Sequence, residues 1–393
     1  MKIREIRSAA IDGHGEWILV EILTDSGAVG WGEAFPAIAG KGRAVCELVS
    51  WAAPALFDRD PCNVQALMEG LYRTFTNRGA AHSSSVFRAA LAGVEIALWD
   101  LAGKALNAPL YKLLGGKYRD SIRLYADCHA GVTNTRTDVF AGAEAAGAYD
   151  PEAFGTRARS MVAQGFQAVK FDLQRLASSM PDAFNRTLST AEIRTCVEQI
   201  TAVRSAVGPD IEIALDIMSA IDVPSAIRLG RALAELDLLW MEEPVPPENL
   251  DALAQVDAQA GVTICTGENL YTLHQFEQLM LRRAAHIIEP DFQKTGLAEG
   301  KRIADLASTH YIPVAPHCVS TPIGTMASVH LCAAFANFLF LEFHESDIPY
   351  WSGLGKGTAH HIRNGAIAVP EGPGLGIEPD LDVVREHLVY GEL

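Results

Sequence analysis

The chain lacks several features that mark whole classes of protein. It has no run of about 18 apolar residues, so we expect no membrane-spanning helix. Its formal net charge is −16 and no cluster of lysine and arginine stands out, which argues against a nucleic-acid partner. The opening residues, MKIREIRSAA, contain no apolar stretch of the kind found in signal peptides. The seven cysteines are scattered and form no CxxC motif, so we expect reduced thiols in a cytoplasmic protein.

The composition is that of an ordinary soluble protein with a large core. Hydrophobic residues make up 49% of the 393 residues, and charged residues make up 20%. The first 36 residues read as strands with a hairpin turn at 24–27, and residues 86–106 carry apolar side chains at helical spacing. Residues 1–120 are therefore predicted to form an α+β unit.

The pattern changes after residue 120, where short apolar runs alternate with helical stretches. Each run ends in a polar residue, and eight runs occur, at 122–127, 166–172, 211–216, 236–243, 262–268, 286–291, 311–317 and 338–344. Eight strand–helix units predict the α/β class and a (β/α)8 TIM-type barrel over residues 121–355. A Gly- and Pro-rich stretch at 365–380 predicts that residues 356–393 cross back and complete the N-terminal unit.

Carboxylates recur at the ends of these runs with a nearly constant spacing. Asp216, Glu242 and Glu268 follow one another at intervals of 26 residues. In such barrels the carboxyl ends of the strands form the active site, and three carboxylates brought together repel unless a cation joins them. Oxygen ligands favour Mg²⁺ or Mn²⁺, so the spacing predicts a metal site. The alternative is that these are separate acids paired with surface lysines.

Two glutamates stand side by side at the end of one run, in WMEEP. Side chains alternate along a strand, so Glu242 and Glu243 cannot both face the same way. The spacing selects Glu242 as the ligand. Glu243 is expected to point away and to form an ion pair or hydrogen bonds with a neighbouring strand or helix.

Acid–base groups accompany the carboxylates. Asp291 ends the next run and His317 the one after it, and a carboxylate beside a histidine fixes its tautomer and raises its basicity, as a general base requires. Lys170 lies on the other side of the predicted barrel, with Asp172 facing the same way. We expect burial and the metal to lower the pKa of Lys170, which would act as a second acid or base or as a clamp for a carboxylate. The alternative is a simple ion pair with Asp172.

This set of groups suits the removal of a proton α to a carboxylate. The carboxylate of the substrate would bind Mg²⁺, and the metal would stabilise the enediolate formed when His317 or Lys170 takes the proton. The predicted partner is therefore a small-molecule carboxylate.

Short motifs run through nearly the whole chain, namely GWGE (30–33), ALWDLAGKALNAPLYKLLGG (97–116), AVKFD (168–172), ALD (214–216), WMEEPVPPENL (240–250), TGENLY (266–271), PDFQKTG (290–296), APH (315–317) and PGLGIE (373–378). Together they resemble the enolase superfamily, in its mandelate racemase and muconate lactonizing enzyme-like branch, which contains the sugar-acid dehydratases. The resemblance implies one Mg²⁺ per active site, bound by the three spaced carboxylates. It also implies a His317–Asp291 dyad on one face of the substrate and Lys170 on the other.

The resemblance extends to substrate binding. Glu342 resembles the acid that contacts the substrate carboxylate or enediolate, and Lys294 resembles a residue near the dyad. The N-terminal unit resembles a capping domain whose mobile loops select the substrate, here near His14–Trp17 and at 72–85. His14 and Trp17 are therefore expected to contact the substrate, and Asp172, which faces the same way as Lys170, is expected to contact it from the barrel. Because capping domains of relatives pair across subunits, we expect a homo-oligomer.

The resemblance favours a lyase that dehydrates an aldonate or aldarate to a 2-keto-3-deoxy acid. Galactonate dehydratase-like relatives often carry Asp-x-His after the third strand, where this chain has Asp216-Ile217-Met218. His317, Lys170 or metal-bound water would then have to protonate the leaving hydroxyl. The main alternative is a racemase, epimerase or lactone cycloisomerase that uses the two bases directly. A metal-assisted hydrolase and a non-catalytic binding protein are the readings from other classes.

Overall fold

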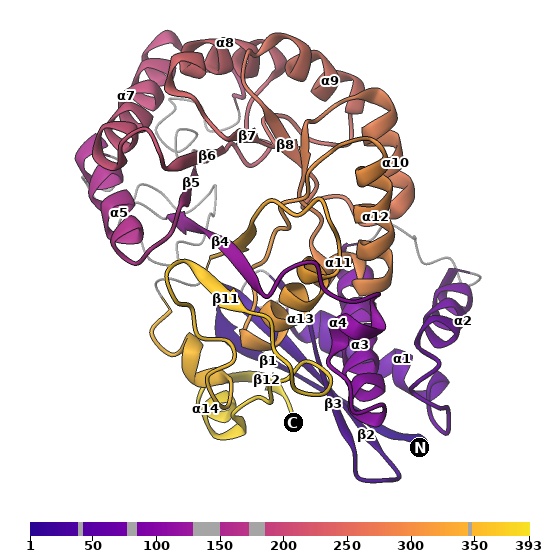
Figure 1. The fold of residues 1–393 in the computed structure, drawn as a ribbon. Coiled ribbons are helices and arrows are strands. Elements are labelled where there is room, and N and C mark those ends of the chain that lie inside the picture. Colours follow the sequence, from indigo (N-terminus) through magenta and orange to yellow (C-terminus); the bar gives the residue numbers. More distant parts are fainter. Residues whose placement is uncertain (38–41, 77–84, 129–149, 173–184, 345–347) are drawn as a thin grey trace.

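The computed structural model describes residues 1–37, 42–76, 85–128, 150–172, 185–344 and 348–393 (Figure 1). Within these ranges no helix is long and apolar enough to cross a membrane. All seven cysteines are free thiols, and every one except Cys62 is buried. Six of the seven therefore pack as core side chains.

An antiparallel sheet forms the centre of the N-terminal unit, with strand order β12-β1-β2-β3. Its strands are β1 (Ile3–Gly13), β2 (Gly15–Thr24), β3 (Val29–Ala37) and, from the end of the chain, β12 (Leu388–Gly391). Four helices belong to the same part of the chain, namely α1 (Gly42–Ala52), α2 (Val64–Thr76), α3 (Ser85–Ala105) and α4 (Leu110–Leu113). Side chains alternate along β2, so Ile18 and Val20 join the core with α1–α3 while Trp17 and Leu19 join the core shared with the barrel.

The second part of the chain is a curled parallel sheet with the order β10-β4-β5-β6-β7-β8-β9. Val314 bridges to Ile288 on one side and to Phe338 on the other, which closes the curl through the seventh predicted run. All eight runs thus lie where the barrel prediction placed them. The strands are β4 (Ser121–Cys128), β5 (Ala168–Asp172), β6 (Glu212–Asp216), β7 (Trp240–Glu242), β8 (Ile264–Thr266), β9 (Ile287–Ile288) and β10 (Leu341–Phe343).

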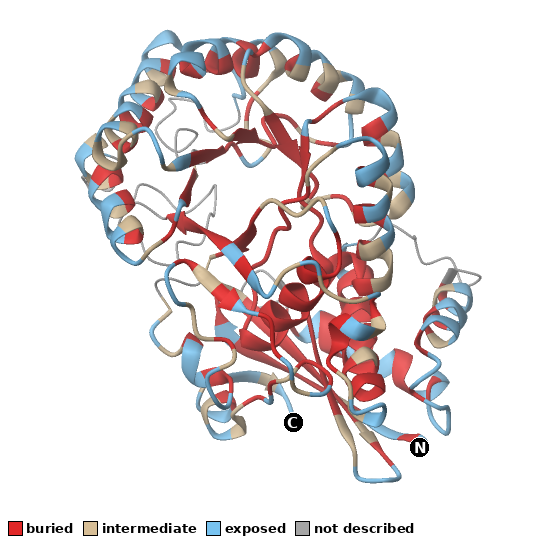
Figure 2. Cartoon of the chain, in the orientation of Figure 1, coloured by how far each residue is buried: buried red, intermediate tan, exposed pale blue. Residues whose placement is uncertain are grey.

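Helices surround this sheet on its outside (Figure 1). Figure 2 shows buried strands at the centre and helices whose outer sides are exposed, as amphipathic helices around a barrel require. Their bounds are α5 (Pro151–Ala163), α7 (Thr190–Val207), α8 (Val223–Leu233), α9 (Leu250–Gln259), α10 (Leu273–Arg282) and α12 (Leu297–Thr309). Two further helices, α11 (Phe292–Thr295) and α13 (Pro322–Ala333), are buried along their whole length, because they pack against the N-terminal unit. The stretch at about 128–160 is polar and rich in Gly and Ala, which predicts a loop over the site; this is wrong for 151–163, which is helix α5, and 129–149 lie outside the described residues.

Each of the eight runs contributes one side chain to an apolar floor inside the barrel. The floor consists of Tyr125, Ala168, Ala214, Trp240, Cys265, Ile287, Ala315 and Phe340. Because side chains two residues apart on a strand share a face, the next inward-facing position on each run lies directly above this floor.

The C-terminal segment connects both parts of the molecule. β11 (Ala366–Ala368) pairs with β4 of the barrel, and β12, after α14 (Leu381–Glu386), pairs with β1. Between them, the buried Asp100 carboxylate accepts hydrogen bonds from the backbone N–H of Leu375 (2.8 Å) and of Trp31 (2.9 Å). The segment therefore contacts the barrel as well as the N-terminal unit. We propose the division 1–120, 121–355 and 356–393 for these units.

The GWGE motif joins the N-terminal unit to the barrel. A Cβ at Gly32 would lie 2.1 Å from the carbonyl oxygen of Gly93, so only glycine lets β3 approach α3 this closely. Next to it, the buried Glu33 carboxylate accepts hydrogen bonds from the backbone N–H of Thr321 and of Gly324, both 2.8 Å, at the start of α13. Glu33 thus satisfies helix N–H groups that have no partner within the helix.

Candidate active site

An ionisable layer lies directly above the apolar floor. Two residues beyond the floor position, seven of the eight runs carry an acidic or basic side chain, all of them buried. The layer consists of Asp127, Lys170, Asp216, Glu242, Glu289, His317 and Glu342. Five of these were predicted as site residues from the spacing or the resemblance, and the structure brings all five into one layer.

The one run without an ionisable side chain in the layer is the fifth, which has Gly267 at this position. The backbone of Gly267 has φ +145°. A Cβ there would lie 2.9 Å from the Phe276 ring and 3.0 Å from the Glu289 backbone nitrogen. Because no side chain fits at this position, the fifth run presents the next residue, Glu268, to the site. Glu268 therefore lies just after the end of β8, whereas Asp216 and Glu242 lie within their strands. The interval between Glu242 and Glu268 is still 26 residues.

Lys170 lies among carboxylates from three other strands. Its Nζ is 2.8 Å from Glu342 Oε1, 3.0 Å from Glu242 Oε1 and 3.9 Å from Asp216 Oδ2. Burial opposes its positive charge, but Glu242 and Glu342 outweigh burial and raise the pKa of Lys170 well above its usual value. Burial acts in the expected direction, but the carboxylates around the amine reverse the expected lowering of this pKa.

The predicted dyad is present. His317 Nδ1 lies 2.7 Å from Asp291 Oδ2, and on its other side Nε2 lies 3.0 Å from Glu268 Oε2 and 3.6 Å from Glu342 Oε2. Burial opposes the imidazolium, yet Glu342 and Glu268 raise the pKa of His317 to about 9. The ring thus has one nitrogen fixed by a carboxylate and the other directed at the carboxylates in the centre of the site.

The three predicted metal ligands are held by protein donors. Asp216 and Glu242 are partners in the register of β6 and β7. Asp216 Oδ1 accepts from the Met218 N–H (2.7 Å), Glu242 Oε2 accepts from Trp240 Nε1 (2.9 Å), and Glu268 Oε1 accepts from Asn269 Nδ2 (2.9 Å). Within the part of the chain that the structure describes, no three His, Cys, Asp or Glu side chains converge on a point ready for a metal ion.

The charge balance of the site nevertheless fits a hard cation. Burial, with Glu242 as the next cause, raises the pKa of Asp216 well above its usual value, because the carboxylates repel one another in a low-dielectric setting. An added divalent cation would relieve this repulsion, and the donors available are all oxygens. Carboxyl groups outnumber basic groups here, namely Asp127, Asp172, Asp216, Glu242, Glu268, Glu289, Asp291 and Glu342 against Lys170, Lys294, His317 and His344.

Glu243 points away from the ionisable layer, as predicted. Its carboxylate accepts hydrogen bonds from Asn269 Nδ2 (2.7 Å), Ser219 Oγ (3.0 Å) and Thr266 Oγ1 (3.3 Å). These donors lie on or after the two neighbouring strands, so the prediction of hydrogen bonds to a neighbouring strand is confirmed. Of the two adjacent glutamates, Glu242 belongs to the site. Glu243 forms hydrogen bonds that connect the ends of the neighbouring strands.

The N-terminal unit covers the dyad with an aromatic ring that the sequence reasoning missed. Phe35 lies 5.9 Å from the His317 ring, centroid to centroid, and Lys294 Nζ lies 3.9 Å from the Phe35 centroid. Lys294 also donates to the Glu268 carbonyl oxygen (2.7 Å). Phe35 lies two residues after GWGE, and this position near a motif was the only signal for it in the sequence.

The two substrate-contact residues predicted from the capping domain lie on the β1–β2 hairpin. The His14 ring meets the His344 ring edge to face, with centroids 4.4 Å apart. Trp17 lies within β2 and is fully buried, so its expected position in a loop is wrong. Its indole N–H is buried and has no hydrogen-bond partner among the described residues. In the other predicted loop, Tyr72 lies in α2, and 77–84 are outside the described residues.

Three further members of the site were missed, although their runs were recognised, namely Asp127, Glu289 and His344. Asp127 ends the first run and His344 ends the eighth, and His344 Nε2 lies 3.2 Å from Asp127 Oδ2. Burial raises the pKa of Asp127 to about 8. The Asp127–His344 pair forms only because β10 pairs with β4 and closes the barrel. The predicted closure of the barrel was therefore the one feature of the sequence that could have indicated this pair.

Met218 stands where some relatives carry a histidine. It has φ +49° and its side chain is 37% exposed, and a thioether cannot supply a proton. Asp172 is the register partner of Asp216 at the neighbouring strand end. The third strand of the barrel, β6, therefore contributes the Asp216 carboxylate to the site, but Met218 after it supplies no proton donor.

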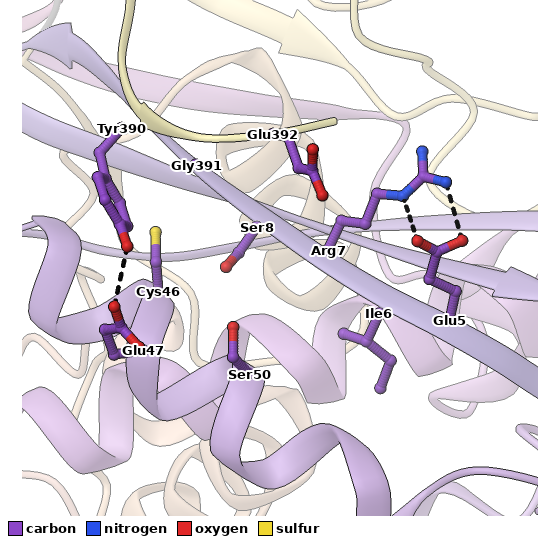
Figure 3. A pocket seen from close by; sticks show the side chains of 10 residues that line it. All are labelled: Glu5, Ile6, Arg7, Ser8, Cys46, Glu47, Ser50, Tyr390, Gly391 and Glu392. Atoms are coloured by element: carbon purple, nitrogen blue, oxygen red, sulfur yellow. Dashed lines mark hydrogen bonds and ion pairs between the residues drawn. The ribbon is translucent and has the colours of Figure 1, made fainter.

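A hollow of about 400 Å³ lies elsewhere, between α1, β1 and β12 (Figure 3). None of the predicted site residues lines it. Its cation, Arg7, is already paired with Glu5 (2.8 Å) and lies 3.5 Å from Glu21. The hollow therefore offers no unpaired positive charge for an acidic substrate.

Comparison with known proteins gives matches over nearly all of the chain. Residues 153–383 match the family model "Enolase C-terminal domain-like", and residues 8–115 match "Mandelate racemase / muconate lactonizing enzyme, N-terminal domain". The chain is 38% identical to a D-xylonate dehydratase of Haloferax volcanii, over 100% of this chain and 90% of the relative. It is 30% identical to a D-galactarolactone cycloisomerase of Agrobacterium fabrum, over 94% and 90%.

A solved structure has the same fold throughout. The mandelate racemase/muconate lactonizing enzyme-like protein of Rubrobacter xylanophilus superposes with a TM-score of 0.90 at 39% identity, covering 99% of this chain and 98% of that chain. The family predicted from the sequence motifs is thus confirmed. The chain belongs to the enolase superfamily, in its mandelate racemase and muconate lactonizing enzyme branch.

Proposed function

We propose that this chain is a Mg²⁺-dependent hydro-lyase that dehydrates a sugar acid to a 2-keto-3-deoxy acid. The observation that carries the proposal is that two basic groups flank one carboxylate: Lys170 Nζ lies 2.8 Å and His317 Nε2 3.6 Å from the two oxygens of Glu342. Relatives named as D-xylonate, D-gluconate and D-galactonate dehydratases support the same class, which agrees with the lyase predicted from the sequence.

Asp216, Glu242 and Glu268 are the residues that we propose hold the cation. A bound Mg²⁺ would neutralise the substrate carboxylate and stabilise the negative charge that develops as the α-proton leaves. His317 would then favour the neutral form that a base requires, because the charges of Glu342 and Glu268 that raise its pKa would be offset.

The proton transfers fall to this chain's own side chains. His317, oriented by Asp291, would act on one face of the substrate, and Lys170 would act on the other. The configuration at the α-carbon decides which of the two takes the proton. Glu342, Asp172, His14 and Trp17 are proposed to contact the substrate. The cytoplasmic location and the homo-oligomer stay predictions.

A second candidate is a cycloisomerase or epimerase on a related acid. It is favoured by Met218, which removes the proton donor known from the third strand, and by the relative named as a D-galactarolactone cycloisomerase. Such an enzyme would use the two basic groups without expelling a hydroxyl.

The test is an activity screen with a ligand variant as control. The purified chain, with Mg²⁺, is incubated with five- and six-carbon aldonic and aldaric acids, and 2-keto-3-deoxy acids are measured. We expect one acid or a few to be converted, and Glu242→Gln to convert none. Isomerisation of an acid with all hydroxyl groups retained would favour the second candidate instead.

A further inference from the structure

A second imidazole–carboxylate pair lies at the mouth of the barrel, separate from the His317–Asp291 dyad. His344 Nε2 is 3.2 Å from Asp127 Oδ2. Asp127 is 2% exposed, and the His344 side chain is 17% exposed, so the carboxylate is buried while the ring reaches the surface of the site. The arrangement has the same parts as the dyad: a buried acid that orients a ring at the end of a neighbouring strand.

The position of the pair follows from the strand register. Asp127 is the register partner of Lys170, and His344 lies two residues beyond Glu342, whose carboxylate contacts Lys170. Side chains two residues apart share a face, so His344 stands above Glu342 on the side toward the N-terminal unit. Asp127 is therefore part of the layer that we propose performs the proton transfer, and His344 lies next to that layer, one step nearer the entrance.

The N-terminal unit covers this pair. The His14 ring packs edge to face against His344 with centroids 4.4 Å apart. The same hairpin is fixed to the segment after β10, because the Tyr350 hydroxyl donates to the Asp12 carbonyl oxygen (3.0 Å). A substrate whose carboxylate lies at the metal ligands would extend its remaining carbons toward this covered end.

Dehydration requires a proton for the hydroxyl that leaves, and the third strand offers only Met218. Lys170 is held by Glu242 and Glu342, and His317 faces the carboxylates from the other side. We propose that His344, oriented by Asp127, protonates the departing hydroxyl group. This assignment rests on the proposed function. His344 would be the catalytic residue and Asp127 a positioning residue.

After the base has taken the α-proton, the electron pair of the former C–H bond forms the π bond of a C2=C3 double bond. The C3–O bond breaks, and its oxygen takes the proton from the His344 imidazolium and leaves as water. The resulting enol tautomerises to the 2-keto-3-deoxy acid. The Asp127–His344 pair can hold a proton near neutral pH. Burial raises the pKa of Asp127 to about 8, and the opposite effect of Lys170 is smaller.

The experiment compares two readouts in His344→Gln, with Mg²⁺ and an acid that the wild type converts. Product formation should fall at least about 100-fold, as for loss of a general acid, while exchange of the α-proton with D₂O continues within a few-fold of the wild-type rate. Asp127→Asn should show the same split with a smaller loss. His286→Gln is the matched control, because it removes another histidine–aspartate pair (2.7 Å to Asp257) on the exposed surface.

A leaving group that needs no proton separates a chemical role from a structural one. With the 3-deoxy-3-fluoro analogue, fluoride leaves unprotonated, so His344→Gln should eliminate it at close to the wild-type rate. Two results overturn the assignment: dehydration by His344→Gln within a few-fold of wild type, or equal loss of exchange, dehydration and fluoride release. A wild type that neither exchanges nor dehydrates any acid overturns the proposed function, and this assignment with it.

Discussion

His317 Nδ1 lies 2.7 Å from Asp291 Oδ2, at the ends of two neighbouring runs of the barrel. This contact fixes which nitrogen of the ring faces the centre of the site. Asp291→Asn keeps the shape but removes the negative charge that stabilises the imidazolium. We expect the rate of α-proton exchange to fall by about 100-fold or more, with the fold retained. Exchange by proton NMR and circular dichroism measure both effects, and an unchanged exchange rate would contradict the role of the dyad.

Mg²⁺ should stabilise the folded chain through Glu242 and not through its neighbour Glu243. A ligand that binds only the native state contributes about 2.7 kcal/mol when its free concentration is about 100 times its Kd. Thermal unfolding of the wild type should therefore shift upward with Mg²⁺ relative to EDTA. Glu242→Gln should abolish the shift and Glu243→Gln should keep it. Equal shifts in both variants would refute the choice of Glu242 as a ligand.

The contact between Glu33 and the start of α13 should be a large contribution to stability. Glu33→Ala leaves the N–H groups of Thr321 and Gly324 without their buried acceptor, which should cost about 3 kcal/mol or more in the free energy of unfolding. Glu69→Ala is the control, because its ion pair with Arg73 (2.6 Å) is exposed, and such pairs contribute about 0.5 kcal/mol or less. Urea unfolding measures both, and similar losses would contradict the account of this junction.

Acid should destabilise the chain through His330, which is buried between α4 and the C-terminal segment. Its Nδ1 accepts from the Tyr111 N–H (3.3 Å), and its Nε2 lies 3.1 Å from the Leu375 carbonyl oxygen, so the neutral ring is satisfied on both sides. Burial lowers the pKa of His330 from 6.5 to about 4. The unfolded chain therefore binds the proton first, and stability is lost as the pH falls from 6.5 to 4.

The size of this effect follows from the pKa shift, roughly 3 kcal/mol for the full change. It is measured as the difference in unfolding free energy between wild type and His330→Gln at each pH. That difference should be largest above pH 6.5 and should shrink by about this amount by pH 4. A difference that is independent of pH would show that the neutral ring is not what the structure requires.

The sequence predicted the parts of the site that repeat along the chain. The regular spacing of runs and of the acids at their ends located Asp216, Glu242 and Glu268, and alternation along a strand separated Glu242 from Glu243. What it could not predict depends on contacts between distant segments. Phe35 reaches the dyad from the N-terminal unit, and His344 meets Asp127 only because the last strand closes on the first.

The sign of the Lys170 pKa shift was also out of reach of the sequence. Burial alone lowers the pKa of a lysine, and the expectation followed that rule. Two carboxylates from strands far along the chain, Glu242 and Glu342, lie within 3.0 Å of its nitrogen and reverse the direction. Such a balance requires the distances, and composition or spacing cannot supply them.

The most direct measurement is a proton NMR time course of the wild-type chain with Mg²⁺ in D₂O and an acid that the screen selects. The account predicts loss of the C2 proton signal together with the appearance of a 2-keto-3-deoxy acid carrying one deuterium at C3. Exchange or inversion at C2 with every hydroxyl retained would contradict dehydration and leave an isomerase on the same residues.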